Sequence, residues 1–406
     1  MGRVIPRRTA AAGSSRAETS SARVLVASDW APIRAFDPIV RDDPEAVYGD
    51  LLPVLRRADL RIVNCECALT SAATPVWKSG AVFRGEPAHV KGLTVVPFEV
   101  ACLANNHVLD YGVAGLRESL RVLHRHNIKT VGAGLTDEQA HAPLTLTVNT
   151  QTIHIVNISE GEDLTASLGG PGVFGWDIPR ATALVRQCKK RGGVVIAIAH
   201  AGLEYVPYPP LYVVSAFRAM VDAGADCVIG HHPHVPQGIE RWRGQPILYS
   251  LGNFVFYQQT SLYHRKIGFC VSLQCEGRRV TAVDLHPYRI TDTGLRVLDA
   301  TEQVSFRRGL ARISRPFKTA AGPANAWEAW LACYGEKGFR AEVLGILEKM
   351  TTDPQKGAAM FRNRITTMQH TELWRTFLTR MMDGTKRGYS REAHRTVEEY
   401  FSKTIS

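Results

Sequence analysis

Five short apolar segments of the sequence each lead to residues that can bind a metal ion or move a proton. In chain order these residues are Asp29; Glu66; Asn105, Asn106, His107 and Asp110; His200; and His231, His232 and His234. Carboxylates supply hard oxygen ligands, and imidazoles supply the borderline nitrogen that Zn, Mn or Fe prefer. One carboxylate can bridge two ions roughly 3.5–4 Å apart and so help to activate a water molecule between them. These residue types predict a centre for two divalent ions.

The apolar segments themselves have the length and β-branched composition of buried strands. They lie at residues 24–27, 60–63, 100–103, 152–156, 194–199, 227–229 and 247–249. Residues 115–126 and 179–191, which lie between strands, have apolar side chains at the three- and four-residue spacing of amphipathic helices. This alternation predicts an α/β fold. Ligands bind at the carboxyl ends of the strands in such sheets, so the polar residues are expected to meet in one crevice.

The pattern changes toward both ends of the chain. Residues 1–22 are rich in Ala, Ser and Arg without periodicity, which predicts a disordered tail. Residues 266–290 alternate around Glu276-Gly277 and predict an antiparallel hairpin. Helical patterns follow at 326–334, 341–350 and 372–382. We therefore expect a main domain over 23–305 and an accessory helical region over 306–406.

The distribution of charge along the chain bears on which partners the protein can bind. The 406 residues carry a formal charge of +11, concentrated at residues 1–23 and at 303–406, where 18 Lys and Arg face 10 Asp and Glu. This basic region is interpreted as solvated helix faces or as a surface for a polyanionic ligand. Nucleic acid is not an expected partner, because no basic stripe with stacking aromatics is seen.

The compartment is inferred from what the sequence lacks. No run approaches the roughly 20 apolar residues of a membrane span, and the N-terminus has no apolar core of a signal peptide. Eight cysteines are too few for a disulfide scaffold, and Cys65 and Cys67 are interpreted as buried thiols rather than soft-metal ligands. We expect a cytoplasmic protein; the sequence does not define its oligomeric state.

Several of these motifs, taken in order, resemble those of a known family. They are residues 59–66, 104–112, 200–205, 230–235 and 249–254. Together they span about 24–256 and resemble the poly-γ-glutamate capsule biosynthesis (CapA-like) family, a branch of the calcineurin-like metallophosphoesterases. The resemblance implies a four-layer α/β/β/α sandwich with a C-terminal helical extension. It also implies two divalent ions, of Mn, Zn or Fe, and attack by a metal-bound hydroxide on a phosphoester, or on an ester or amide.

The resemblance also assigns roles position by position. Asp29, Glu66 and His234 would hold the first ion, with Glu66 as the bridge, and Asn106, His200 and His232 would hold the second. His107 would be the general acid and Asp110 would orient it. Two departures affect the first site: Asp29-Trp30-Ala31 lacks the histidine of the superfamily's Asp-X-His, and Glu66 replaces an Asp. We expect this site to have fewer protein ligands.

Six further residues are candidates for contact with an anionic small-molecule or polymer substrate. They are Lys78, Arg84, Glu204, Tyr205, His231 and Asn253. Each has a structural alternative: solvated charge for the two cations, loop chemistry for Glu204 and Tyr205, an orientation away from the site for His231, and support of a loop for Asn253. Asn106 and Asp110 could also act only as helix caps.

Three functions remain open at this stage. The first is a metal-dependent hydrolase. The second is a non-catalytic component of poly-γ-glutamate capsule assembly, and the third is a tailoring enzyme of a small-molecule biosynthetic pathway.

Overall fold

Strands from both halves of the chain form the first of two large sheets. The computed structural model describes residues 21–161, 169–384 and 387–405. The first sheet has the order β18-β17-β16-β1-β2-β5-β6, and β15 pairs with β1. Its strands are β1 Ala22–Ala31, β2 Leu60–Cys65, β5 Val100–Cys102, β6 Lys129–Val131, β15 Asn253–Phe256, β16 Ile267–Glu276, β17 Arg279–Ile290 and β18 Leu295–Val297.

A second sheet is formed by the middle of the chain. Its order is β13-β14-β12-β11-β9-β8. The strands are β8 Leu144–Val148, β9 Gln151–Ser159, β11 Val194–His200, β12 Cys227–His231, β13 Ile239–Trp242 and β14 Gln245–Leu248. Two short pairs complete the strands: β3 Ala68–Leu69 with β4 Arg84–Gly85, and β7 Ala133–Gly134 with β10 Gly172–Val173.

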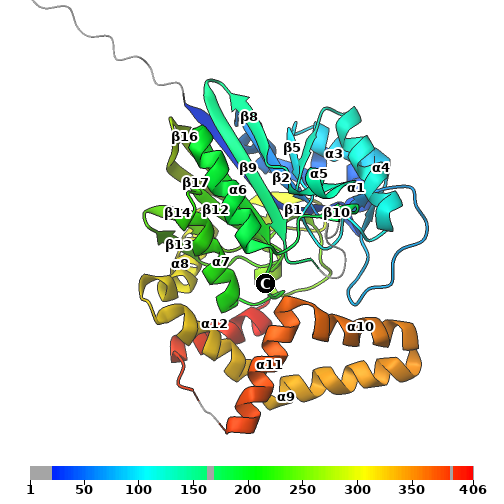
Figure 1. The fold of residues 1–406 in the computed structure, drawn as a ribbon, viewed down its shortest axis with the longest axis vertical. Helices are drawn as coiled ribbons and strands as arrows, with labels where there is room; N and C mark the ends of the chain where they lie inside the picture. Colours follow the sequence, from blue (N-terminus) through cyan, green and yellow to red (C-terminus); the bar gives the residue numbers. More distant parts are fainter. Residues whose placement is uncertain (1–20, 162–168, 385–386, 406) are drawn as a thin grey trace, which may run out of the picture.

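The helices before residue 250 cover the outer faces of the two sheets (Figure 1). They are α1 Phe36–Asp42, α2 Leu52–Arg56, α3 Val90–Thr94, α4 Gly112–Arg125, α5 Asp137–His141, α6 Ile178–Arg191 and α7 Leu211–Asp222. Short 3₁₀ helices lie at η1 Ala46–Leu51, η2 Pro87–His89, η3 Tyr263–Arg265 and η4 Arg315–Lys318.

Three separate apolar clusters show that the sandwich has four layers. Alternate residues of a strand point to opposite faces of its sheet. Val63 of β2 therefore packs with the outer helices α3 and α4, whereas Ile62 faces Ile196 of the other sheet. A third cluster joins that sheet to α6 and α7 through Val195 and Phe217. The predicted α/β/β/α architecture is confirmed.

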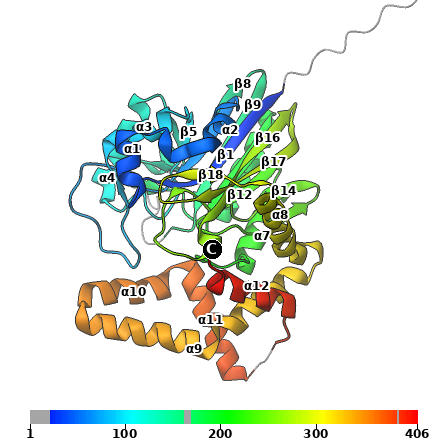
Figure 2. The ribbon, with the colours of Figure 1, turned by 180° about the vertical axis from the view of Figure 1, so that it is seen from behind.

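The last quarter of the chain is helical and lies across one end of the sandwich (Figure 2). Its helices are α8 Ala300–Ser314, α9 Gly322–Thr352, α10 Pro354–Thr366, α11 Met368–Asp383 and α12 Arg391–Ser402. Trp327 and Leu331 of α9 and Leu373 of α11 form a fourth apolar cluster with Leu203 and Val206 of the sandwich. None of the helices in the described part of the chain is long and apolar enough to cross a membrane.

The expected elements can now be compared with this arrangement. Every predicted strand overlaps an observed one, although residues 103 and 249 lie one position beyond the ends of β5 and β14, and the hairpin at 266–290 is β16 and β17. Two predicted helices are the halves of α9, which bends at Gly335, where φ is 50°. The predicted helical patterns of the C-terminal region did not include α8, α10 or α12. The expected tail falls mainly on residues 1–20, outside the described residues, and Ala22 already belongs to β1. The division at 305–306 stays a prediction; α8, which spans it, packs against β16 through Phe306 and Phe269.

Candidate metal centre

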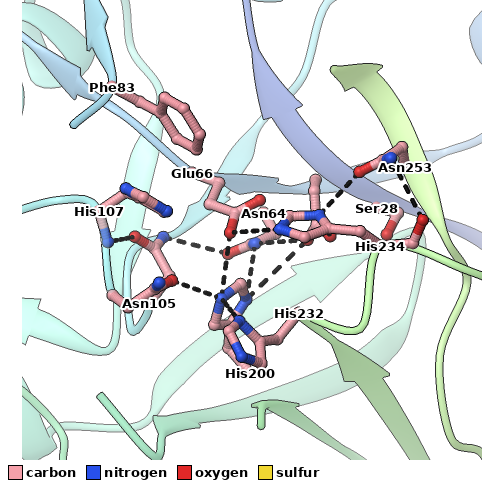
Figure 3. A network of polar contacts seen from close by, with 12 residues as sticks. Ser28, Asn64, Glu66, Phe83, Asn105, His107, His200, His232, His234 and Asn253 are labelled. Carbon is pink, nitrogen blue, oxygen red and sulfur yellow. Dashed lines mark hydrogen bonds and ion pairs between the residues drawn. The ribbon is translucent and has the colours of Figure 1, made fainter. Parts of the chain in front are cut away.

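The predicted ligands converge at the carboxyl ends of strands from both sheets (Figure 3). Glu66 directly follows β2, His200 is the last residue of β11, and His232 and His234 follow β12. Asp29 differs slightly from the expectation, because β1 continues two residues beyond it. The register of β1 shifts on both sides of Asp29, as in a β-bulge, and such irregularities re-aim side chains next to active sites.

The segment after β12 has a constrained backbone. His232 and His234 have φ angles of 98° and 56°, a region that side chains other than glycine rarely occupy. A Cβ atom at Gly230 would lie 2.0 Å from the carbonyl oxygen of Tyr249, so this position requires glycine. Strained residues persist where the surroundings hold them, and they cluster at functional sites.

One group of donor atoms surrounds His200. Its Nε2 atom lies 2.9 Å from Asn106 Oδ1, 3.2 Å from Glu66 Oε1 and 3.1 Å from His232 Nδ1. These are the four side chains expected around the second ion. Two nitrogen and two oxygen donors from four separate segments therefore point toward one position.

A second group of donors shares Glu66 with the first. His234 Nδ1 lies 3.5 Å from Asp29 Oδ2, and His234 Nε2 lies 3.8 Å from Glu66 Oε1. Glu204 is close as well: one of its carboxylate oxygens and ligand atoms of His232 and His234 all lie within 4.8 Å of one another. Glu204 could thus supply an additional oxygen ligand at a site where Asp29-Trp30-Ala31 lacks the histidine of the Asp-X-His motif.

The buried oxygens of the two acidic residues fit cations. Asp29 Oδ2 and both carboxylate oxygens of Glu66 are buried and have no hydrogen-bond partner among the residues that the structure describes. Burial, followed by the charge of Asp29, raises the pKa of Glu66 well above its usual value. Burial also acts on Asp29, but the nearby histidines outweigh it and lower the pKa of that carboxyl. Buried polar atoms of native proteins are normally paired, so these oxygens fit metal ions.

Amide side chains hold the ligands in place. Asn64 Nδ2 donates to Asp29 Oδ1 at 2.8 Å and lies 3.1 Å from His200 Nδ1. Asn253 Oδ1 lies 2.8 Å from His234 Nδ1, and its Nδ2 donates to the His234 carbonyl. Asn253 therefore supports the candidate ligand His234 and its loop. Hydrogen bonds of this kind fix the orientation of metal ligands.

His107 is the centre of a separate buried network beside the ligands. Its Nδ1 atom lies 2.7 Å from Asp110 Oδ2, which also accepts from the Phe83 N–H at 2.6 Å. Lys78 Nζ donates to Asp110 Oδ1 and to the Asn106 carbonyl, at 2.9 and 2.7 Å. Burial and then Lys78 lower the pKa of His107 to about 4. Asp110 thus contacts the imidazole and does not cap α4.

A cleft of about 410 Å³ opens onto these residues. Its lining includes Asn106, His107, Glu204, Tyr205 and His234 together with Arg34, Gly80, Ala81, Phe83, Phe256, Gln258, Gln259, Thr260 and Arg265. The Arg265 guanidinium lies 3.6 Å from the ring centroid of Tyr205. Arg34 donates to the Tyr257 carbonyl at 3.0 Å. The cleft therefore carries two guanidinium groups next to the candidate ligands.

Three of the expected substrate-contact residues lie elsewhere. Lys78 is buried against Asp110, and Arg84 is exposed outside the cleft lining, where it donates to the Ala72 carbonyl. His231 is fully buried, and within the described ranges neither of its ring nitrogens has a hydrogen-bond partner. Glu204 and Tyr205, in contrast, line the cleft.

Four residues of the site did not emerge from the sequence: Asn64, Arg34, Arg265 and Gln369. Asn64 could have been found, because it lies two positions before Glu66 and so on the same side of the chain. Asn105, one of the polar residues that follow β5, shapes the turn there, because its Oδ1 accepts from the N–H groups of His107 and Val108. Arg34, Arg265 and Gln369 reach the site only through tertiary packing.

A four-layer α/β/β/α sandwich with carboxylate, amide and imidazole groups at its strand ends defines a metallophosphoesterase-like fold. Comparison with known proteins gives a narrower class. The chain belongs to the family described as Bacterial capsule synthesis protein PGA_cap, whose model matches residues 17–258.

Named relatives of the family show different degrees of similarity. The chain is 38% identical over 172 residues to the PGA biosynthesis protein CapA of Bacillus subtilis (strain 168), covering 42% of this chain and 45% of that protein. It thus spans less than half of that relative. It is 30% identical over 301 residues to a probable polyglutamine synthesis accessory protein of Mycobacterium tuberculosis (strain ATCC 25618 / H37Rv), covering 66% of this chain and 79% of the relative.

Solved structures with similar folds are more distant. A phosphatase of Mycoplasma pneumoniae superimposes with a TM-score of 0.40 and 14% identity, covering 66% of this chain and 94% of that one. The sulfate thiohydrolase SoxB of Thermus thermophilus also gives a TM-score of 0.40, with 11% identity and coverage of 71% and 60%.

Proposed function

We propose that this protein is a metal-dependent hydrolase that cleaves a phosphoester, or an ester or amide, of an anionic substrate. The observation that carries the proposal is the set of buried Asp29 and Glu66 oxygens that have no hydrogen-bond partner among the described residues and lie among three imidazoles. Buried carboxylate oxygens that lack hydrogen-bond partners in the described part of the chain are costly, and bound cations would offset that cost. The set lies beside a cleft that a substrate can enter.

Each side chain has a task in this scheme. Asn106, His200 and His232 would hold one ion, Asp29 and His234 the other, and Glu66 would contact both. Two divalent ions at this position supply Lewis acidity and lower the pKa of a water molecule. Glu204 is placed to add an oxygen at the side of His232 and His234.

Burial and then Lys78 keep His107 a neutral imidazole above its pKa of about 4, and a bound anionic substrate would raise that pKa so that His107 can give a proton to the leaving oxygen. Its Nδ1 atom is engaged by Asp110, so Nε2 is the nitrogen available to a substrate in the cleft. Asp110 fixes the orientation of the ring. Burial opposes ionisation of Asp110, but His107 and then Lys78 outweigh it, lower the pKa of this carboxyl and keep it ionised. A positioned acid of this kind contributes about 10²–10⁴-fold to the rate.

The substrate class follows from the charge of the cleft. Arg34 and Arg265 place two permanent positive charges near the candidate reaction site, and Tyr205 and Gln258 offer polar contacts. Guanidinium groups recognise carboxylates and phosphates through paired hydrogen bonds. We therefore propose a substrate with an anionic group beyond the bond that is cleaved.

A test of the hydrolase uses an activated aryl phosphodiester, with the protein loaded with Mn²⁺ or Zn²⁺. The variant His107→Ala should lower kcat by about 10²–10⁴-fold. His124→Ala is the matched control, because His124 is an exposed histidine of α4 that contacts Thr130 outside the cleft. Equal kcat values for wild type and His107→Ala, in samples that contain the same amount of metal, would rule out the assigned acid.

A second function, non-catalytic binding of polyglutamate, is favoured by the descriptions of the two relatives and by the arginines of the cleft. Binding of polyglutamate that persists in chelator and falls with salt, without hydrolysis of any ester tested, would favour this alternative. Binding lost on chelation would favour the hydrolase.

A further inference from the structure

The C-terminal helical region reaches the metal centre through one side chain. Gln369, the second residue of α11, is buried, and its Oε1 atom lies 3.3 Å from His232 Nε2. The family model ends at residue 258, so this contact comes from a part of the chain beyond the matched segment. Gln369 touches a candidate ligand from the side opposite to the candidate ions.

The two nitrogens of His232 face different partners. Nδ1 lies 3.1 Å from His200 Nε2, in the group that also contains Asn106 Oδ1 and Glu66 Oε1. Nε2 faces the amide oxygen of Gln369, which can only accept a hydrogen bond. A neutral imidazole carries one N–H, so a proton on Nε2 leaves the lone pair of Nδ1 for a metal ion.

Independent contacts fix the start of α11 at this position. Leu373, one turn further along the helix, packs against Leu203 and Val206 in the loop after His200. Glu160 accepts from the Tyr212 hydroxyl at 2.7 Å and from the Gly202 N–H at 3.0 Å. Burial raises the pKa of Glu160 to about 7, although Tyr212 and the backbone N–H groups of Gly202 and Gln369 act in the opposite direction. Gln369 is therefore held where its side chain meets His232.

We propose that the C-terminal helical region completes the metal centre, with Gln369 as a positioning residue that keeps His232 in the tautomer whose Nδ1 binds metal. This inference rests on the proposed metal ligands and does not depend on which bond is hydrolysed. Carbonyl and carboxylate partners of ligating histidines fix the tautomer, and their loss typically weakens metal binding about 10–100-fold.

The first test compares two substitutions by titrating the metal-free protein with Mn²⁺ alone. Gln369→Leu keeps much of the side-chain volume and removes the acceptor, so the dissociation constant should rise about 10–100-fold. Gln369→Glu keeps an acceptor oxygen and should bind at least as tightly as wild type. Unfolding in chelator confirms that both variants are folded. Wild-type affinity in Gln369→Leu would overturn the proposal, as would an equal loss in both variants.

The second test uses the unaltered chain, so it applies even where Gln369→Leu does not fold. In protein labelled with ¹⁵N-histidine and kept in chelator, the His232 ring should carry its proton on Nε2. The His232→Gln variant identifies its signals by their absence. A proton on Nδ1 would overturn the inference. Neither the Mn²⁺ titration nor the NMR measurement requires turnover. A failure of the hydrolase assay would therefore not decide the outcome of either test.

Discussion

Lys78 Nζ lies 2.9 Å from Asp110 Oδ1, and the two side chains are only 5% and 1% exposed. The same ammonium donates to the carbonyl oxygen of Asn106. Lys78 thus ties the carboxylate behind His107 to the loop that carries a candidate metal ligand. A cation that the sequence suggested as a substrate contact is instead placed to organise the site from behind.

Replacement of this cation should destabilise the protein. In Lys78→Met the buried carboxylate of Asp110 keeps its charge and loses its ion pair. Breaking a buried pair in this way reduces the free energy of unfolding by about 3–5 kcal/mol. Urea unfolding in chelator measures the change. Arg84→Met, at an exposed position outside the cleft, is the control and should change stability by at most about 0.5 kcal/mol. A loss in Lys78→Met as small as that of the control would contradict the prediction.

Removal of metal should reveal the electrostatic repulsion between the candidate ligands Asp29 and Glu66. Wild-type protein is expected to gain about 2.7 kcal/mol when free Mn²⁺ is present at 100 times its dissociation constant. Glu66→Gln should lose this gain. In chelator near neutral pH the same variant should be more stable than wild type, because Glu66, whose pKa burial and Asp29 raise well above its usual value, must take up a proton on folding and the amide need not.

Thermal unfolding with EDTA or Mn²⁺ measures both effects. Glu118→Gln serves as a control, because Glu118 contacts Thr70 and Ser71 away from the cleft and should keep the full response to metal. A Glu66→Gln variant that is less stable in EDTA and still gains stability from Mn²⁺ would refute the assignment of Glu66 as a shared ligand.

The sequence predicted where the candidate ligands lie because their positions depend on local rules. A parallel strand in an α/β sheet ends at the crevice, so a polar residue after β2, β11 or β12 faces the same space as its neighbours. Glu66, His200 and His234 follow that rule. Asp29 deviates, because a bulge rather than the end of β1 turns its side chain, and a bulge leaves no clear pattern in the sequence.

Arg265 and Gln369 could not be found by the same reasoning. Arg265 lies in a 3₁₀ turn before β16, and only the packing of that turn against Tyr205 brings the guanidinium to the cleft. Gln369 depends on how α11 docks on the loop after His200, through Leu373 and Leu203. Such contacts are long-range results of tertiary packing, and periodicity within α11 contains no information about them.

Arg265→Gln should weaken substrate binding. The Nε atom of Arg265 is buried and has no hydrogen-bond partner within residues 21–161, 169–384 and 387–405, so a substrate anion is a fitting partner. Loss of one charge-assisted hydrogen bond, about 1.5–3 kcal/mol, should raise KM for an anionic substrate about 10–100-fold. Steady-state kinetics at low and high salt measure this change in KM, with Arg84→Gln as the control. An unchanged KM would exclude Arg265 as a contact.

Lys356→Met tests a second link between the helical region and the cleft. Lys356 Nζ, on α10, donates to the carbonyls of Lys78 and Gly80 at 3.0 and 2.7 Å, and Gly80 lines the cleft. Without these bonds the segment that contains Lys78 and Gly80 loses about 1.5–3 kcal/mol of stabilisation per charged hydrogen bond. KM should rise while the Mn²⁺ affinity stays at the wild-type value, in contrast to Gln369→Leu. A parallel loss of metal would indicate that Lys356 acts on the whole region instead.

His264 should make the docking of α12 sensitive to acid. Its ring stacks on Tyr400 of α12 with centroids 3.7 Å apart, and its Nε2 atom is buried with no hydrogen-bond partner in the described part of the chain. Burial, then Lys403 and Arg312, lower the pKa of His264 to about 3 from 6.5. The unfolded chain therefore binds a proton between these two values that the folded protein does not bind.

The free energy of unfolding must then fall as the pH decreases below 6.5. At pH 5 the contribution of His264 amounts to about 2 kcal/mol relative to pH 8. His264→Phe keeps the stacking and cannot be protonated. Between pH 8 and pH 5 the free energy of unfolding of this variant should therefore fall by about 2 kcal/mol less than that of wild type. Urea unfolding of wild type and variant at both pH values measures the difference. If the two proteins lose equal stability between pH 8 and pH 5, His264 is protonated in the folded protein and the buried, neutral imidazole is excluded.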